Sequence, residues 1–493
     1  MLTLSLAKCI NATKNGAFTV KDLDLSAPLS YEDVLFLAEY LKVTPVTDLD
    51  LSMTITRENS KALGDLSQVI AKNSLLQKLT FEATLNFDFY FKHNLPIGWL
   101  DFIDDYRLKK IVTPVYEALV DMLKNKPTLN KLTVDFLAME TPIDNKHINH
   151  LARSINKIPL HYLNLGLSVA KEAQIPLLKT KEPNQSLEFL ILRGFNSGRS
   201  VLKYLPQTSV LKMLAIDDMQ FETHDLKLLD AIMKSNTALD TLILGKTNLG
   251  QINSPDVLTW LRTCLNLNSL ILIDNNLSRL NVDNLCELLA NNPQTLKKLD
   301  LSKNAYMGDD AVKIAKALTV NTHIETLVLD DNYIENEGLQ AIIELVKTNK
   351  NITSLSISNT CRYTPSNEII HNLCDLLRDP GCQLKELKFN QDITLAQYLM
   401  LQYALDSNKT LQFVDFNFRN QNILEAILGK NNSSDLNETE FSSDNTKEER
   451  VPNTLNADPT GKSAPLFFIS SKNQLEENEK QSPSLLSHGI HLH

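Results

Sequence analysis

Two histidines have the spacing of a metal-binding pair on a helix. His147 and His150 lie three residues apart, so a helix at this place would turn both side chains to one side. A zinc site also needs a third ligand, and a zinc hydrolase needs a glutamate as general base, but the neighbouring sequence supplies neither. We therefore interpret both residues as surface histidines and predict no metal site.

A second group resembles part of a phosphate-binding loop. Gly461, Lys462 and Ser463 match the end of a P-loop, whose backbone amides and lysine hold the phosphates of a nucleotide. The glycine required five residues before Gly461 is replaced by Asn456, and no apolar strand precedes it. Nucleotide binding is therefore not expected.

The remaining residues with chemical potential also lack a supporting context. The histidines at the end of the chain lie in a segment without the neighbouring groups that orient metal ligands. The sequence contains no G-x-S-x-G elbow and no cysteine in a recognisable nucleophile motif. We therefore predict a protein that is not an enzyme and that uses no cofactor and no small-molecule substrate. These terminal histidines are His488, His491 and His493.

The cysteines indicate a reducing compartment. They are scattered along the chain and include no C-x-x-C pair. In a chain of 493 residues this is typical of reduced thiols that are mostly buried as small hydrophobic residues, which favours a cytosolic protein. The six residues are Cys9, Cys264, Cys286, Cys361, Cys374 and Cys382.

Charge and hydropathy limit the possible partners. The formal net charge is −10 and the pI is near 5.6, so the chain lacks the basic face that nucleic-acid binding requires. No apolar stretch approaches the roughly 20 residues that span a bilayer, so no membrane insertion is expected. The start, Met1 to Leu6, lacks the charged region of a secretory signal, and we expect an extra strand or edge cover there.

The elements that must position any functional side chain come from a repeat. Fourteen segments read L-x-x-L-x-L with conservative substitutions, and their starts fall mostly 26 to 32 residues apart. Such a period is the signature of a solenoid, in which each unit buries its apolar face against copies of itself. The copies begin at Val20, Val46, Leu76, Leu129, Leu160, Leu187, Leu211, Leu239, Leu267, Leu296, Ile324, Ile352, Leu384 and Leu411.

The copy that begins at Ile324 shows the plan of one unit. Leu327 and Leu329 are two residues apart, so both point to one side of a strand. Asn332 can use its side-chain amide to satisfy backbone groups where the strand turns away. After Gly338 the apolar residues recur with the i, i+3, i+4, i+7 spacing of one helix face: Leu339, Ile342, Ile343 and Val346.

This pattern resembles the leucine-rich repeat family, in its long-repeat, ribonuclease-inhibitor-like branch, over roughly Val20 to Lys430. The resemblance implies an α/β fold, a curved solenoid or horseshoe with parallel strands on the concave side and helices on the convex side. Two copies depart from it: Thr360 stands where Asn is expected, and Ala83 and Thr84 replace turn residues. The clearest copies carry Leu267, Leu270, Leu272 and Asn275; Leu296, Leu299, Leu301 and Asn304; and Ile324, Leu327, Leu329 and Asn332.

We predict a solenoid of about 14 repeats over residues 1–430 and a tail over residues 431–493. The solenoid contains one insertion near residues 85–128, with aromatic residues around Trp99. Long inserts are often functional, so these aromatics could form a contact patch. The alternative is a degenerate repeat with a helix from Val112 to Leu123 that packs its aromatics inward.

The tail has ten acidic and five basic residues and few apolar ones, so we expect it to be disordered. Glu476, Glu477 and Glu479 precede a terminus of small and apolar residues. This order resembles the translocation signal of type IV-secreted bacterial effectors, many of which carry leucine-rich repeats. It implies an effector that a bacterium secretes into the host cytosol and that acts in virulence, although a plain solvated tail would look much the same.

In the predicted solenoid, residues that flank the core leucines face the concave side. The first two copies place Asp22, Asp24, Asp48 and Asp50 there. Adjacent strands lie about 4.8 Å apart, so these carboxylates would lie close together and favour a partner with a basic surface. Alternatively, solvent screens their repulsion and they have no such role.

In the central copies the same positions become apolar. A contiguous exposed apolar patch usually marks a partner site, although such residues also suit strands for packing reasons alone. We predict that this patch binds a protein partner. Its members are Tyr162, Phe189, Ile191, Met213, Ile243, Ile271, Ile273 and Val328.

Together these features predict a noncatalytic scaffold that binds a protein through its concave face. The family resemblance leaves two alternatives. One is a regulator of small GTPases of the long-repeat type, which would need a polar or arginine residue on the loops that follow the strands, where the sequence alone shows no clear candidate. The other is a fragment of a cytosolic inhibitor or innate-immune sensor.

Overall fold

The structure is a computed structural model of the 493-residue chain. The chain divides into two compact units, Met1–Leu424 and Glu425–His493, and every described residue lies in the first. The predictions for the tail and for Met1 to Leu6 lie outside the described residues. The structure describes residues 22–25, 31–44, 46–56, 59–85, 97–137, 145–169, 186–195, 202–205, 210–252, 258, 261, 266–277, 282–291 and 295–416.

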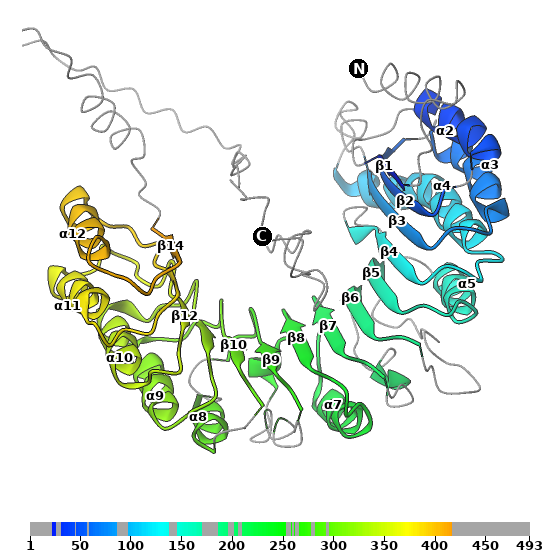
Figure 1. The fold of residues 1–493 in the computed structure, drawn as a ribbon. Coiled ribbons are helices and arrows are strands. Elements are labelled where there is room, and N and C mark those ends of the chain that lie inside the picture. The colour runs from blue at the N-terminus through cyan, green and yellow to red at the C-terminus, as the bar shows by residue number, and fades with distance from the viewer. Residues whose placement is uncertain are drawn as a thin grey trace, which may run out of the picture. The chain divides into compact units, whose positions relative to one another are not determined.

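Each of the fourteen leucine-rich copies forms a strand that begins two residues after the first anchor of the copy. The strands pair in chain order in one parallel sheet, which confirms the predicted α/β solenoid (Figure 1). The strands are β1 (Asp22–Leu25), β2 (Asp48–Ile55), β3 (Lys78–Leu85), β4 (Lys131–Asp135), β5 (Tyr162–Val169), β6 (Phe189–Phe195), β7 (Met213–Asp217), β8 (Thr241–Gly245), β9 (Ser269–Ile271), β10 (Lys298–Asp300), β11 (Thr326–Val328), β12 (Ser354–Ser356), β13 (Glu386–Lys388) and β14 (Phe413–Asp415).

Helices lie on the outer side of the sheet, and the strands line the inner side (Figure 1). Because all strands run in one direction, the helices that return the chain also share one direction. In the described part of the chain the helices are α2 (Tyr31–Val43), α3 (Asn59–Lys72), α4 (Ile97–Met122), α5 (Asn145–Ile155), α7 (Thr223–Ser235), the 3-10 helix η4 (Leu249–Gln251), α8 (Val282–Ala290), α9 (Gly308–Thr319), α10 (Glu335–Thr348), α11 (Asn367–Arg378) and α12 (Leu395–Leu405).

Charged side chains follow the direction of the helices. The first turn of α9 carries Asp309 and the first turn of α10 carries Glu335, whereas Lys316 and Lys347 lie in the last turns of these helices. Carboxylates near a helix N-terminus and cations near its C-terminus offset the partial charges of the helix ends. These two helices therefore carry opposite charges at their two ends.

The core leucines stack from strand to strand. Leu299, Leu327 and Leu355 are register partners in three neighbouring strands, and all three are buried. Similar residues continue along the sheet, so one apolar core lies between the strands and the helices. The face of α10 predicted from its spacing is buried as expected: Leu339, Ile342, Ile343 and Val346.

Asparagines after β9, β10 and β11 link their repeats to the preceding ones. The Oδ1 atom of Asn304 accepts hydrogen bonds from the backbone N–H groups of Asn275 and Leu277, at 3.0 and 3.3 Å. Its Nδ2 atom donates to the carbonyl oxygen of Leu272, in the preceding repeat, at 2.6 Å. Asn275 and Asn332 make equivalent bonds, so buried backbone groups at these turns find partners in the next repeat.

The departure at Thr360 is compensated by the following repeat. The buried backbone N–H of Thr360 donates to the Oε1 atom of Gln391 at 3.1 Å. The Nε2 atom of Gln391 donates to the Oγ1 atom of Thr360 at 2.7 Å and also to the carbonyl oxygen of Ile357. The other departure, at Ala83 and Thr84, lies inside β3, which continues past both residues.

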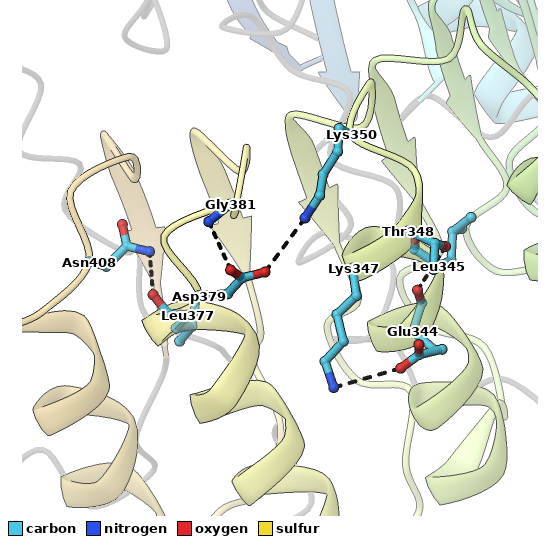
Figure 2. Close-up of polar contacts among 9 residues, drawn as sticks. All are labelled: Glu344, Leu345, Lys347, Thr348, Lys350, Leu377, Asp379, Gly381 and Asn408. Carbon is cyan, nitrogen blue, oxygen red and sulfur yellow. Dashed lines mark hydrogen bonds and ion pairs between the residues drawn. The ribbon is translucent and has the colours of Figure 1, made fainter.

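Side chains at the helix ends form a second set of links between repeats. Figure 2 shows Asn408, which follows α12, donating from Nδ2 to the carbonyl oxygen of Leu377 in α11 at 2.7 Å. Asp379 accepts a hydrogen bond from the backbone N–H of Gly381 at 2.8 Å and lies 3.6 Å from the ammonium of Lys350. The carbonyl groups that end one helix are thus satisfied from the next unit.

A lysine has the same role beside the insertion. Lys126 is buried, and its Nζ atom donates to the carbonyl oxygens of Ala71 and Asn73, at the end of α3, at 3.0 and 2.7 Å. Burial lowers the pKa of this ammonium to about 8. The position at a helix C-terminus favours a cation.

The insertion does not interrupt the sheet, because β3 and β4 pair directly. The helix predicted from Val112 to Leu123 is the C-terminal part of the longer helix α4. The buried ring of Tyr116 packs inward against Phe136, with ring centroids 5.4 Å apart. The side chain of Trp99 lies outside the described residues, so a contact patch there stays a prediction.

Shortening one core leucine should weaken the stack. Leu329 is fully buried, so Leu329→Ala should lower the free energy of unfolding by about 2–5 kcal/mol, measured by urea denaturation of the full chain. Leu399→Ala, at a side chain of α12 that is 54% exposed, is the control and should change it far less. Equal midpoints for both variants would contradict the register.

Candidate functional site

The strand face is the side of the sheet that carries the residues alternating with the core leucines. In β2 the side chains alternate between half-buried and buried from Asp48 to Ile55. Equivalent residues of neighbouring strands are register partners, so the sheet also brings together side chains from distant parts of the sequence. The strand face therefore presents rows of side chains that run across the sheet.

The predicted acidic residues are neighbours at one end of the sheet. Asp22 is the register partner of Asp48, and Asp24 is the partner of Asp50. The side chains of Asp22 and Asp24 lie outside the described residues. Asp50 forms an ion pair with Lys78 of β3 at 2.7 Å, so part of the negative charge is neutralised within the protein. Lys78 occupies the first position of β3, so the sequence already contained a signal for this ion pair.

Three of the predicted apolar residues form one row. Tyr162, Phe189 and Met213 are register partners at the first positions of β5, β6 and β7, and all three are half-buried. The rings of Tyr162 and Phe189 have centroids 6.3 Å apart. The ammonium of Lys131, in β4, lies 4.9 Å from the centre of the Tyr162 ring. An apolar row with a cationic border therefore lies on the strand face.

The next row is less exposed than the sequence predicted. Ile243 and Val328 are half-buried, as is Ile273 just after β9, but Ile191 and Ile271 are only 8% and 6% exposed. For these two residues the expectation of partial exposure was wrong. Their third strand position places each side chain between two flanking rows of the strand face, which cover it. They contribute to the floor of the face.

The sequence reading missed a polar row beside this apolar one. The polar row consists of Asp135, Gly166, Arg193, Asp217 and Gly245, which are register partners on β4 to β8. The Nη2 atom of Arg193 donates to the Oδ2 atom of Asp135 at 2.7 Å, two strands away. Burial is the main cause that raises the pKa of Asp217 above its usual range. All five residues occupy the fifth position of their strands, and this shared position is the sequence signal that could have revealed the row.

Two further carboxylates lie toward the other end of the strand face. The Oδ1 atom of Asp300 accepts hydrogen bonds from the backbone N–H and the Oγ–H of Ser302 at 3.0 and 2.6 Å. Asp330 accepts from the Oγ–H of Ser356 at 2.7 Å and from the backbone N–H of Ser358 at 2.7 Å. Burial raises the pKa of both carboxyl groups. These hydrogen bonds fix the position of both carboxylates within the fold.

The histidine pair does not form a site. The prediction of a surface residue was wrong for His147, which is buried because its side of α5 packs toward α4 and stacks on Tyr116. His150 is exposed. Among the described residues, no group of three or more His, Cys, Asp or Glu side chains could hold a metal ion. The P-loop-like residues and the terminal histidines lie outside the described part.

The cysteines within the described ranges are free thiols. Cys374 and Cys382 are buried. Burial raises the pKa of Cys286 to about 11 and that of Cys361 to about 12. A thiol with a high pKa is a poor nucleophile, so these two residues have the environment of packing groups. Cys9 lies outside the described residues, as does Cys264.

One loop that follows a strand carries a positioned arginine. Arg362 lies between β12 and α11, and its guanidinium is 4.8 Å from the centre of the Tyr333 ring. The backbone N–H of Arg362 donates to the Oε1 atom of Glu335 at 3.2 Å. The sequence alone did not single out this residue, because its contacts come from the preceding repeat.

No helix among those described is long and apolar enough to cross a membrane.

No protein-family model matches the chain. The chain is 25% identical over 268 residues to NACHT, LRR and PYD domains-containing protein 14 of Mus musculus, a match that covers 48% of this chain and 27% of that protein. It is 24% identical over 280 residues to NACHT, LRR and PYD domains-containing protein 5 of Bos taurus, covering 49% and 25%. The repeated strands and their register give the chain the fold of a leucine-rich repeat solenoid. The chain spans about a quarter of the length of these relatives.

The chain is also similar to solved structures. The leucine-rich repeat-containing protein LegL7 from Legionella pneumophila has a TM-score of 0.35 and 13% identity, covering 79% of this chain and 99% of that chain. Leiomodin-1 Actin-Binding Site 2 has a TM-score of 0.26 and 17% identity, covering 34% and 90%. Both TM-scores are low, and the fold assignment rests on the strand register of this chain.

The buried carboxylate of Asp300 predicts a specific pH dependence. Because its pKa is higher in the folded than in the unfolded chain, the folded state binds more protons, and its contribution to stability falls as pH rises above the unfolded value. Asp300→Asn removes this titration. The difference in urea midpoint, variant minus wild type, should therefore increase from pH 4 to pH 7.

The control for this measurement is Asp331→Asn. Asp331 is an exposed carboxylate in the next repeat, and its left-handed backbone, with φ of 56°, tolerates asparagine. This variant should show a smaller increase than Asp300→Asn. A difference that shrinks toward neutral pH for Asp300→Asn would contradict the prediction.

Proposed function

We propose that this leucine-rich repeat protein is a noncatalytic scaffold that binds a protein partner through the strand face. The observation that carries the proposal is the row of half-buried apolar side chains formed by Tyr162, Phe189 and Met213, with Ile243 beside it. Aromatic and methionine side chains in such a setting are typical anchors of protein interfaces. The other predicted binding residues, Ile191, Ile271, Ile273 and Val328, would support or extend this anchor.

A partner with a basic surface fits the acidic end of the strand face. The four aspartates of β1 and β2 lie opposite each other in register, and the whole chain has a formal net charge of −10. Opposite charge on the partner would speed encounter and select against acidic competitors. Fourteen strands spaced at about 4.8 Å give roughly 65 Å of face, which is ample for an interface of roughly 1,600 Å².

The helix present in most repeats supports the long-repeat, ribonuclease-inhibitor-like branch of the family. Leucine-rich repeat folds generally act by binding proteins. The same proposal includes that the protein is not an enzyme and that it binds neither nucleic acid nor a small-molecule substrate. An acidic composition without a basic stripe supports the part that concerns nucleic acid.

Charge insertion on the strand face should abolish partner capture. We would use the full chain as bait in cell lysate beside the double variant Phe189→Asp, Ile243→Asp and identify bound proteins by mass spectrometry. A carboxylate placed in an apolar interface cannot be desolvated without a large cost, so the specific partner should be lost. Because both side chains are only half-buried, the melting temperature should change little.

The matched control is Val320→Asp, which makes the same kind of change at a side chain that is 59% exposed at the end of α9. This variant should retain the partner. Identical sets of bound proteins for wild type and the double variant would overturn the proposal. Loss of folding in the double variant would show that the two residues belong to the core.

The two alternative functions each have one supporting observation. Arg362 lies exposed on a loop that follows a strand, as a regulator of small GTPases would require, and a GTPase among the captured proteins would favour that function. The likeness to proteins named for NACHT, LRR and PYD domains supports the second alternative, a fragment of a cytosolic sensor. Capture of a protein with NACHT, LRR and PYD domains from the lysate would favour this second alternative.

We further propose that the protein is a bacterial effector that acts in a host cell. The support is the acidic cluster Glu476, Glu477 and Glu479 before small and apolar residues, together with the repeat array. The test is a translocation reporter fused to residues 431–493 in a bacterium with a type IV secretion system. The unaltered fusion should be transferred, and replacement of the three glutamates by alanine should abolish the transfer. No transfer of the unaltered fusion would overturn this proposal.

A further inference from the structure

Arg193 and Asp217 are oppositely charged register partners on neighbouring strands, yet their side chains turn away from each other. The guanidinium of Arg193 reaches across β5 and pairs with Asp135 at 2.7 Å. The carboxylate of Asp217 lies over Gly245 of β8, on the opposite side. A charged pair that would ordinarily close on itself is therefore held open on the strand face.

Two glycines make this arrangement possible. A Cβ atom at Gly166 would lie 2.7 Å from the Oδ1 atom of Asp135 and 3.3 Å from the Nη2 atom of Arg193. A Cβ atom at Gly245 would lie 2.4 Å from the Oδ1 atom of Asp217. Any other residue at either position would displace the charged group beside it. The open geometry is thus built into β5 and β8.

Each charged group keeps unused hydrogen-bonding capacity. The Nε atom of Arg193 and the Oδ1 atom of Asp217 are buried and have no hydrogen-bond partner among the described residues. The side chain of Arg193 remains 16% exposed and Asp217 is half-buried, so both side chains keep some solvent-accessible surface. Unpaired buried polar atoms cost stability, and a ligand that pairs them gains affinity.

The chemistry of the pair selects a neutral ligand that both donates and accepts. The positive charges of Arg193 and Lys246 balance the negative charges of Asp135 and Asp217, so the site favours neither an anionic nor a cationic group. A carboxamide offers a carbonyl oxygen to the guanidinium and an N–H to the carboxylate within one planar group. A hydroxyl offers both functions from a single atom, whereas a carboxamide offers them from two separate atoms.

The residues beside the pair suit the stem of such a side chain. Ile191 and Ala215 precede Arg193 and Asp217 by two positions in their strands and form a buried apolar floor. Ala215 is small, which leaves room above β7. The half-buried ring of Phe189 borders the same place. An aliphatic stem on this floor would carry its polar tip to the pair.

We propose that Arg193 and Asp217 recognise the side-chain carboxamide of a glutamine or asparagine in the protein partner. The inference rests on the proposed function, since it assigns the chemistry that the strand face selects. It makes the two residues specificity-determining, while the apolar row supplies the anchor.

The test uses a random 12-residue peptide library displayed on phage and selected on the full chain. Enriched peptides should carry a glutamine or asparagine beside apolar residues. Synthetic copies should bind at least tenfold more weakly to Asp217→Asn than to wild type, and a glutamine-to-leucine change in the peptide should have the same effect. The two changes should be non-additive when combined, because each removes the same contact.

The matched control is Asp218→Asn, which makes the same charge change at the next residue. Asp218 is exposed and has a φ of 53°, which asparagine tolerates, so binding should be unchanged. Equal effects of the two substitutions, or enriched peptides without a carboxamide side chain, would overturn the inference. Because the pKa of Asp217 is raised, its neutral isostere should fold, and the melting temperature checks this.

The same peptides separate this inference from the proposed function. Peptides that lose binding with Phe189→Asp but not with Asp217→Asn would keep the strand face as the interface and refute the carboxamide role. Peptides that are insensitive to both substitutions, or a selection that enriches none, would overturn both proposals.

Discussion

The turns after β8, β9 and β10 each depend on a polar group supplied by the next repeat. The backbone N–H groups that follow a strand are buried, and the side chain of Asn275, Asn304 or Asn332 in the following repeat accepts from them. A buried amide without a partner would cost about 1–3 kcal/mol, so a repeat cannot end without a successor or a substitute. Leucine packing alone is not directional; this network sets the spacing and register of the strands.

This dependence explains what the sequence could predict. Core leucines recur with a fixed period, so all strands and the buried face of α10 followed from spacing. Gln391 and Lys126 did not, because each takes the role that an asparagine has in other repeats with a longer side chain. His147 was misplaced because its burial comes from α4, which belongs to the one irregular step of the chain.

The candidate site was predictable only in part, for a related physical reason. Alternation along a strand identifies which residues leave the core, and it correctly placed Tyr162, Phe189 and Met213 in one row. It cannot tell how far a long side chain reaches sideways. Arg193 crosses an entire strand because Gly166 leaves the space, and that relation exists only after strands from distant parts of the chain lie side by side.

The common direction of the helices has an electrical consequence for the described unit. Dipoles that point the same way add rather than cancel, and in α9 and α10 side chains of opposite sign offset them: Asp309 and Glu335 at the helix starts, Lys316 and Lys347 at the helix ends. The starts of α9 and α10 therefore carry negative side chains and their ends carry positive ones. A charged molecule approaching one of these helix ends from solution would meet side-chain charges of one sign over partial charges of the other, so the field that it experiences is weaker than the side chains alone would produce.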